Sequence, residues 1–196
     1  DLVNRRLPSF NSKWSKIWDI QVLSPTRKGL LGVDNLNNEI QAILNPSSKD
    51  KKEKQVRDIV FREGDKVMQI KNNYSLEWHR IGGDGENKGV GVFNGDMGYI
   101  ETIDEERKVL SVVFDDERRV IYEFMFLDEL ELAYAITIHK SQGSEFKVVV
   151  MPTFMGSAFL MNRNILYTGI TRAKELVVVV GNQRSLQYMV NNTNNM

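Results

Sequence analysis

Two short runs dominated by apolar residues, Lys147–Met151 and Leu176–Val180, constrain the possible folds of this chain most. In the second run, the β-branched residues Val177–Val180 are unbroken. Continuous apolar strands are typical of parallel sheets that are covered on both faces, since the covering helices keep water away from each side. A segment with helical character, about Asn162–Ala173, lies between the two runs. The last third of the chain therefore predicts an α/β architecture.

The N-terminal part of the chain shows a similar pattern. An apolar run at Ile20–Leu23 ends at Ser24-Pro25, as expected for a buried strand that opens into a loop. Apolar residues then recur at helical spacing at Leu36, Ile40, Ile43 and Leu44. Asp34 is placed to cap this amphipathic helix, and Pro46 follows its expected end.

The middle of the chain has the character of a small all-β module. Short strands separated by Gly, Asn and Asp turns are expected at Lys66–Ile70, Gly98–Ile103, Val109–Phe114 and Val120–Phe124. The glycine-rich segment 81–89 lacks the Lys-Ser/Thr ending of a phosphate-binding loop, so we expect a hairpin or a mobile loop there. The charged segment Ser47–Lys54 is interpreted as a solvated loop. We expect an α/β domain at 1–71 and 127–196, interrupted by a β insert at 72–126.

Composition excludes several classes of function. Lys and Arg number 26, as do Asp and Glu, so the chain as a whole has no basic field and any nucleic-acid contact must be local. There is no cysteine and there are only two histidines, which argues against a zinc or redox site. No apolar run is long enough to span a bilayer, and the first residues show no signal peptide. We therefore expect a cytoplasmic protein fragment with no membrane partner.

The segment Thr137–Phe146, with the sequence TIHKSQGSEF, carries the strongest functional signal. By itself it could be a helix cap followed by a turn at Gly143. It resembles motif V of superfamily 1 helicases, in the form found in the RecD subfamily. That subfamily comprises the alpha subunit of exodeoxyribonuclease V and its stand-alone relatives.

A second segment, Asn164–Leu176, is similar to motif VI of the same superfamily, with its Tyr-Thr-x-x-Thr-Arg-Ala-Lys core intact. Without the motif, Arg172 could equally be a cation that neutralises the last carbonyls of a helix. The two motifs occur in the order that the family shows, which favours the functional interpretation.

Two further regions extend the resemblance over nearly the whole chain. Val22–Val33, followed by Leu36-Asn37 and Leu44-Asn45-Pro46, resembles the motif IV region of RecD-like proteins, although Arg27 could also be an exposed loop arginine. Phe93–Tyr99 and Val113–Asp116 are similar to the SH3-like insert, subdomain 2B, of these helicases. The implied fold is a RecA-like second motor domain, 2A, interrupted by an SH3-like β-barrel.

The resemblance implies a role for each matched residue. Arg172 would be the arginine finger that stabilises charge on the γ-phosphate of ATP, and Arg27 a second catalytic candidate at the same phosphate. Gly143 would let the backbone approach the nucleotide, and Glu145 would contact its ribose. The side chains expected to hold phosphates of single-stranded DNA are Thr137, His139, Lys140 and Ser141.

The sequence given contains no G-x-x-x-x-G-K-[ST] motif and no convincing Asp-Glu pair for Mg²⁺. ATP and Mg²⁺ are therefore expected only in a full-length enzyme that includes an N-terminal motor domain, and this fragment alone is expected to bind neither, to hold no metal and to be inactive. The resemblance implies a bacterial ATP-dependent 5′ to 3′ DNA helicase or translocase of recombination and repair, with nuclease-complex subunits as further partners. The alternative is a non-catalytic DNA- or protein-binding module with vestigial motor motifs.

Overall fold

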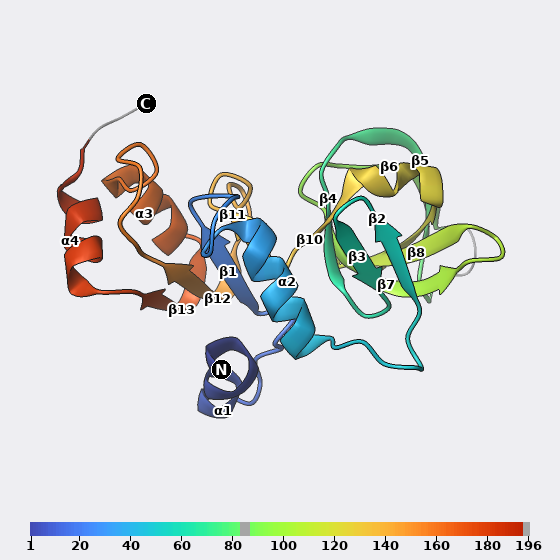
Figure 1. The fold of residues 1–196 in the computed structure, drawn as a ribbon. Helices are drawn as coiled ribbons and strands as arrows, with labels where there is room; N and C mark the ends of the chain where they lie inside the picture. Colours follow the sequence, from blue (N-terminus) through green and yellow to red (C-terminus); the bar gives the residue numbers. More distant parts are fainter. Residues whose placement is uncertain (83–86, 194–196) are drawn as a thin grey trace. The chain divides into compact units, whose positions relative to one another are not determined.

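A computed structural model describes residues 1–82 and 87–193, and it divides into two compact units. We call Asp1–Leu44 with Tyr134–Met196 the α/β unit, and Asn45–Ala133 the β unit. Figure 1 shows both along the course of the chain. An α/β domain interrupted by an all-β insert was expected from the sequence, and this fold class is confirmed. In the part of the chain that the structure describes, no helix combines the length and apolar character needed to cross a membrane.

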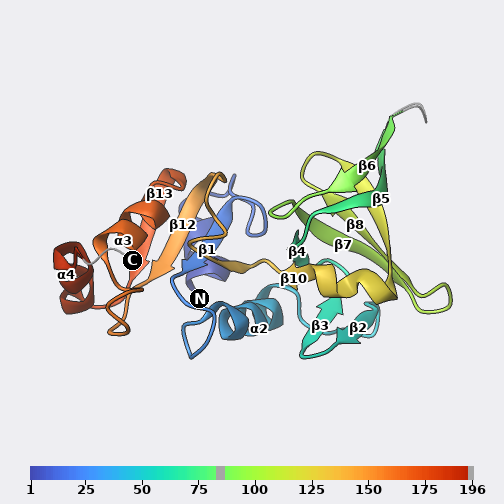
Figure 2. The same ribbon diagram turned by 90° about the horizontal axis from the view of Figure 1, so that it is seen from above.

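The α/β unit is built on a four-stranded parallel sheet with the order β11-β1-β12-β13. Its strands are β1 (Ile20–Ser24), β11 (Ala135–Thr137), β12 (Phe146–Pro152) and β13 (Ala173–Val180). Of these, β1, β12 and β13 run side by side in Figure 2, where α3 (Arg163–Ile170) accompanies β12 and β13. Every residue of β1 is buried, and six of the seven residues of β12 are buried. These two strands thus confirm the interpretation of their apolar runs.

Helices cover both faces of this sheet. On one face, Leu7 and Trp14 form a buried cluster with alternate strand residues, including Ile20 and Val22. The segments that supply this cover are η1 (Leu2–Arg6), α1 (Leu7–Phe10) and α2 (Val33–Leu44). On the other face Gly169 of α3 approaches Met151 so closely that a Cβ would lie 2.7 Å from its sulfur. The sequence pattern predicted α2 and α3 but gave no signal for α4 (Gln183–Asn191).

Two local expectations for the α/β unit need correction. Asp34 lies inside the first turn of α2, because the helix already begins at Val33, so it is not the cap. In β13, the edge strand of the sheet, Val177–Val179 are only half-buried and Val180 is exposed, so the expectation of full cover on both faces fails there. The polar tail 191–196 is also expected from its sequence to be frayed, and residues 194–196 of it lie outside the described residues.

The β unit is a curled antiparallel sheet of seven strands with the order β10-β4-β7-β8-β9-β5-β6, joined by a hairpin of β2 and β3. Its elements are β2 (Glu53–Val56), β3 (Ile59–Arg62), β4 (Lys66–Gln69), β5 (Asn73–Arg80), β6 (Lys88–Val92), β7 (Met97–Asp104), β8 (Val109–Phe114), β9 (Arg118–Glu123), the 3-10 helix η2 (Phe124–Glu129) and β10 (Leu130–Leu132). The four strands expected from the sequence correspond to β4, β7, β8 and β9. Residues 83–86 of the expected glycine-rich loop lie outside the described residues.

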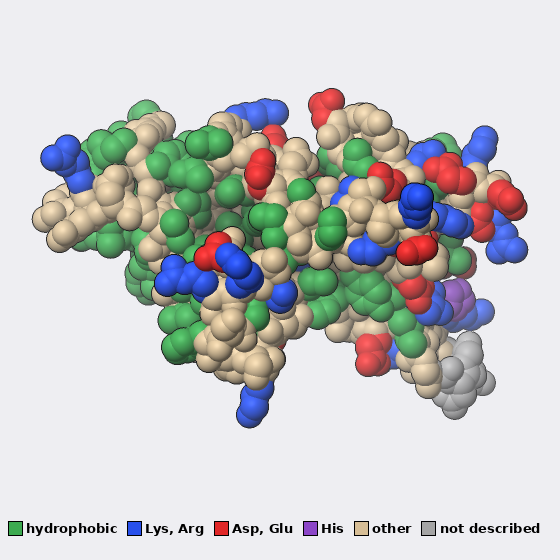
Figure 3. All heavy atoms as spheres, turned by 60° about the horizontal axis from the view of Figure 1, so that its bottom comes forward, with side chains coloured by type: hydrophobic (Ala, Val, Ile, Leu, Met, Phe, Trp, Pro, Cys, Tyr) green, Lys and Arg blue, Asp and Glu red, His purple; other side chains and the backbone are tan. Residues whose placement is uncertain are grey.

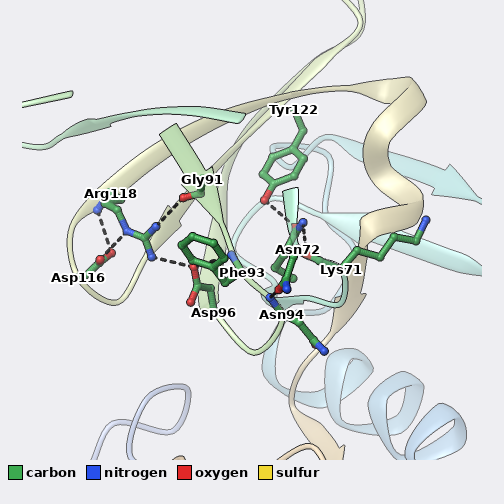
Figure 4. A network of polar contacts seen from close by, with 10 residues as sticks. Lys71, Asn72, Gly91, Phe93, Asn94, Asp96, Asp116, Arg118 and Tyr122 are labelled. Atoms are coloured by element: carbon green, nitrogen blue, oxygen red, sulfur yellow. Dashed lines mark hydrogen bonds and ion pairs between the residues drawn. The ribbon is translucent and has the colours of Figure 1, made fainter. Parts of the chain in front are cut away.

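Arg118 joins the two segments that suggested an SH3-like insert (Figure 4). Its guanidinium pairs with Asp96 of the first segment at 2.8 Å and with Asp116 of the second. Although burial opposes its charge, the hydrogen bonds to these two carboxylates raise the pKa of Arg118. Between the partners, Gly98 leaves no room for a side chain, since a Cβ would lie 2.5 Å from the Val113 carbonyl oxygen. The F-N-G-D-M-G pattern thus encodes a turn, an ion pair and a close strand approach.

The β unit is wider than the insert expected at 72–126, because it spans Asn45–Ala133. Strand β4 pairs with both β7 and β10, which draws residues before 72 and after 126 into the sheet. Asn45 is buried and donates to Asp65 at 2.7 Å, so the segment after α2 also belongs to this unit. The expected solvated loop at Ser47–Lys54 ends in β2, which begins at Glu53. The sequence pattern did not predict this strand, because only one of its faces is partly covered and most of its residues are polar or charged.

Candidate functional site

The motif V segment connects opposite edges of the parallel sheet. It starts at Thr137, which ends β11 at the carboxyl edge beside Ser24, and it finishes at Phe146, which starts β12 at the amino edge. Between these points the chain forms successive turns. Ile138 is fully buried and lies close to Gly169 of α3, so the segment passes along the face of the sheet that α3 covers.

Internal hydrogen bonds hold this turn in shape. The Ser141 side chain is fully buried, and its hydroxyl donates to the Ile138 carbonyl at 2.7 Å. The Thr137 hydroxyl accepts from the Lys140 amide at 3.2 Å. Gly143 has a φ of +85°, in the left-handed region that favours glycine, and a Cβ there would meet no atom within 4 Å. The left-handed backbone conformation of the turn is therefore sufficient to explain why residue 143 is a glycine.

Arg172 connects motif VI to motif V at the amino edge of the sheet. It directly follows Thr171, the C-cap of α3, and its guanidinium donates to the carbonyls of Thr168 and Ser144, both at 3.3 Å. Its backbone carbonyl accepts from the Phe146 amide at 2.8 Å. The helix-end role considered from the sequence is thus realised geometrically, and the same guanidinium also contacts the motif V turn. Arg172 is half-buried, so part of it remains open to a ligand.

Glu145 lies next to this cluster. Its carboxylate pairs with Lys174 at 3.1 Å, and both side chains are more than half exposed. The two residues adjoin Phe146 and Ala173, which are paired in the register of β12 and β13. The structure therefore brings Gly143, Glu145 and Arg172 to one edge of the sheet, with Lys174 as a cation that the sequence reasoning did not single out.

The carboxyl edge holds the second group of candidates. Thr137 is half-buried, His139 is exposed and Lys140 is half-buried. His139 and Gln142 help to line a hollow of about 150 Å³ between the motif V turn and α3. Its complete lining is Ile138, His139, Gln142, Asn162, Asn164, Ile165 and Thr168. Hydroxyl, amide and imidazole groups therefore gather beside the turn.

Arg27 lies at the carboxyl edge and not beside Arg172. It follows β1 in the loop before α2, where it pairs with Asp34 at 3.2 Å. Ile20 pairs with Val148, so the end of β1 lies level with residue 152, six residues beyond the start of β12. That offset corresponds to about 20 Å of strand rise. The structure therefore does not bring the two candidate arginines together.

Asn37 is a positioning residue that the sequence reasoning did not assign. It is buried in α2, donates to the Ala135 carbonyl at 2.9 Å and accepts from the Ala135 amide at 2.8 Å. These two bonds hold β11, the edge strand that leads into motif V. Its signal was present in the helix pattern, because Val33, Asn37 and Gln41 occupy one face of α2 at four-residue spacing and all are buried.

The residues present suit one side of a phosphorylated ligand better than a metal ion. Guanidinium and ammonium groups lie at the amino edge in Arg172 and Lys174. Within residues 1–82 and 87–193, no group of three or more His, Cys, Asp or Glu side chains could hold a metal.

Comparison with known proteins gives matches in both units. Residues 36–114 match the model described as ATP-dependent RecD-like DNA helicase SH3 domain, and residues 132–180 match the UvrD-like helicase C-terminal domain. The chain belongs to the RecD-like helicase family. Its fold, a RecA-like α/β domain with an SH3-like insert, is the one that the sequence resemblance implied.

Individual relatives agree with this assignment. The ATP-dependent RecD2 DNA helicase of Deinococcus radiodurans is 33% identical over 168 residues, which cover 86% of this chain and 21% of that protein. The RecBCD enzyme subunit RecD of Buchnera aphidicola is 28% identical over 185 residues, or 89% of this chain and 27% of that protein. The chain thus spans about a fifth to a quarter of the length of these two RecD-like relatives.

Solved structures support the fold. A Bacteroides Pif1 helicase in complex with ADP-AlF3 and ssDNA gives a TM-score of 0.52 at 18% identity, with 82% of this chain and 40% of that chain covered. A second Pif1 structure, described as unwinding forked dsDNA, gives a TM-score of 0.53 at 18% identity and covers 94% of this chain and 44% of that one. At this identity the likeness concerns the fold alone.

Proposed function

We propose that the chain is the C-terminal motor half of an ATP-dependent DNA helicase or translocase, to which it contributes an arginine finger and part of the grip on single-stranded DNA. One observation carries the proposal: the guanidinium of Arg172 in motif VI donates to the Ser144 carbonyl in motif V. A residue facing nucleotide is thereby coupled to the segment that reaches the opposite edge of the sheet.

The amino edge is proposed to face the nucleotide. ATP, when bound, supplies the phosphoryl group that is transferred to water, and an always-protonated guanidinium can stabilise the charge that develops on it. Arg172 is held by two carbonyls and not by a carboxylate in the described residues, so its positive charge is not neutralised before the ligand arrives. Glu145 lies where it could accept a hydrogen bond from a ribose hydroxyl, and Lys174 orients it. The nucleotide must be gripped on its other side by the N-terminal motor domain.

The carboxyl edge is proposed to face single-stranded DNA. Thr137, His139 and Lys140 offer hydroxyl, imidazole and ammonium groups that can bind phosphates without reading sequence. We assign Ser141 to the stability of the turn, because its buried hydroxyl already donates to Ile138. Arg27 lies at this edge, so we group it with the DNA contacts and propose Arg172 as the finger.

Motif V would then transmit closure of the nucleotide site to the DNA grip. Because the segment is short and held by internal hydrogen bonds, a shift at Ser144 can move Thr137 and His139 without unfolding the turn. We propose 5′ to 3′ movement, a role in recombination and repair in the bacterial cytoplasm, and Mg²⁺ bound with ATP in the full-length protein. Assembly with nuclease subunits, as in the RecBCD relatives, belongs to the same proposal.

A binding module with vestigial motor motifs is the alternative. The mutual contacts of motifs V and VI favour the motor, since a module would have no need for an arginine that joins them. The two are separated by assaying DNA-stimulated ATP turnover for the 196-residue chain and for the longer protein that contains it. The motor predicts turnover only in the longer protein. ATP turnover by the isolated chain, above the level of an Arg172→Ala control, would contradict the proposal that this chain holds only half of the ATP site. If the longer protein has an intact ATP site and still shows no turnover, the binding module is favoured.

A further inference from the structure

The formal charge of the chain is divided unequally between its two units. The β unit has 14 Lys and Arg and 20 Asp and Glu, a net charge of −6, whereas the α/β unit has 12 and 6, a net charge of +6. Figure 3 shows one face, on which acidic and basic side chains are interspersed over the β unit, so the excess of acidic residues is spread over its surface. The overall neutrality of the chain thus conceals an acidic module that would repel nucleic acid and attract cationic partners.

The outer face of β5 and β9 contains a hollow of about 320 Å³. Its lining combines apolar, carboxylate and amide groups and consists of Asn73, Ser75, Leu76, Glu77, His79, Ile121, Glu123 and Phe126. Ile121 is 58% exposed, and Leu76 and Phe126 beside it in the lining extend the apolar surface. The hollow therefore offers an accessible apolar floor on the acidic unit.

A bulge in β5 builds this hollow. The pairing of β5 with β6 shifts register between Asn73 and Glu77. The Asn73 side-chain oxygen accepts from the amides of Ser75 and Leu76 at 3.1 and 3.2 Å, which fixes the bulged residues in a local turn. Its amide group donates to Glu129 at 3.0 Å. Bulges of this kind redirect side chains at the surface of a sheet, so the hollow is a defined feature of the fold.

Two carboxylates flank the apolar floor. Glu77 belongs to β5 and Glu123 to β9, and among the residues that the structure describes neither forms an ion pair with Lys or Arg. On the same unit, Glu101 is bound by Arg119 through two hydrogen bonds of 2.7 and 2.5 Å. The uncompensated negative charge thus lies where the apolar surface is open.

We propose that this hollow docks an extended lysine- and arginine-rich segment of another protein. An aliphatic side chain of the segment packs on Ile121, and cationic side chains on either side of it meet Glu77 and Glu123. Burial of an apolar anchor supplies affinity, and the complementary charges orient the segment and speed its association. The acidic surroundings select a cationic polypeptide over a DNA strand.

A defined probe tests this docking site on the 196-residue chain. The probe is a fluorescein-labelled peptide with one leucine flanked on each side by three lysines, and binding is followed by fluorescence anisotropy. Glu77→Gln/Glu123→Gln is expected to weaken binding about tenfold, as two weak surface ion pairs would. Glu106→Gln/Glu117→Gln removes the same charge at exposed turns outside the hollow and should change binding less than twofold.

The apolar anchor is tested separately. Ile121→Thr keeps the β-branched shape and should weaken binding of the leucine peptide several-fold, while a peptide with glycine in place of leucine should bind both proteins equally weakly. Thermal unfolding checks that each variant remains folded. If both double variants lose the same amount of peptide affinity, binding depends only on the net charge of the protein, and the proposal is overturned. Displacement of the peptide by a fifteen-residue thymidine oligonucleotide, or absence of saturable binding, would also overturn it.

Discussion

The two edges of the parallel sheet present different chemistry. At the amino edge, Arg172 is held by carbonyl oxygens from two motifs and lies beside an exposed Glu145–Lys174 pair. At the carboxyl edge, His139 is exposed next to a small polar hollow, and Arg27 is already paired with Asp34. The amino edge thus presents an oriented guanidinium that could bind an anionic ligand. The carboxyl edge presents several weaker polar groups along its loops. In the proposed function, the length of one sheet thus separates the nucleotide from the single-stranded DNA, and motif V connects the two edges.

The largest effect is expected at the amino edge. In the full-length protein, Arg172→Ala should lower the DNA-stimulated hydrolysis rate by about 10³ or more and change nucleotide affinity much less, because the finger acts on charge that develops in transfer. Arg172→Lys should recover little activity, since lysine lacks the planar fork that can meet two phosphate oxygens. Single-turnover hydrolysis measures both variants. Rates within a few-fold of the parent would leave Arg172 as a helix-end cation only.

The next effect concerns the strand that leads to the carboxyl edge. Asn37→Leu removes both hydrogen bonds to Ala135 and should lower the free energy of unfolding by about 2 kcal/mol, as expected for buried backbone groups left without partners. Asn38→Leu, on the exposed face of the same helix, is the matched control. Urea unfolding of the 196-residue chain measures both. Equal midpoints would show that the Asn37 amide does not hold β11.

A smaller change is expected for the DNA contacts. Lys140→Ala should weaken single-stranded DNA binding and flatten its salt dependence by up to about one counterion. His139→Ala should also weaken binding, because it removes an exposed polar group beside the turn. Titrations at several salt concentrations provide the measurement. If both variants keep the parent's affinity and slope, the motif V turn does not contact DNA.

The smallest effect on hydrolysis is expected for Arg27. Because it lies at the carboxyl edge, Arg27→Ala should change the hydrolysis rate at saturating DNA by less than about fivefold, far below the loss that a finger would give. Its pair with Asp34 is half-exposed and should contribute no more than about 1 kcal/mol to stability. If a folded Arg27→Ala variant loses a factor of about 10² or more in hydrolysis rate, Arg27 contacts the nucleotide instead.

Much of the fold could be predicted from local patterns. The strands β1 and β12 follow from consecutive apolar residues, because both of their faces are covered by other parts of the chain. The edge position of β13 could not be predicted, since strand order depends on pairings that no local pattern encodes. The extent of the β unit was underestimated for the same reason, because β4 and β10 meet across more than sixty residues of sequence.

The site was predicted less completely. Motif V and motif VI identified the residues around Arg172, but their mutual contact depends on the pairing of β12 with β13. The separation of Arg27 from Arg172 had a sequence signal, since Arg27 follows a strand and Arg172 precedes one, and in a parallel sheet these positions lie at opposite edges. Asn37 could not be paired with Ala135 by spacing, because the two are 98 positions apart.

The central claim is that nucleotide and DNA are bound at opposite edges of one sheet, and the most direct test measures both ligands in both arginine variants. Single-turnover hydrolysis at saturating DNA and the salt dependence of single-stranded DNA affinity are compared for Arg172→Ala and Arg27→Ala in the full-length protein. The account predicts that Arg172→Ala loses hydrolysis with an unchanged salt slope, and that Arg27→Ala keeps hydrolysis within about fivefold and flattens the slope. Comparable losses of hydrolysis in both variants, with both slopes unchanged, would contradict it.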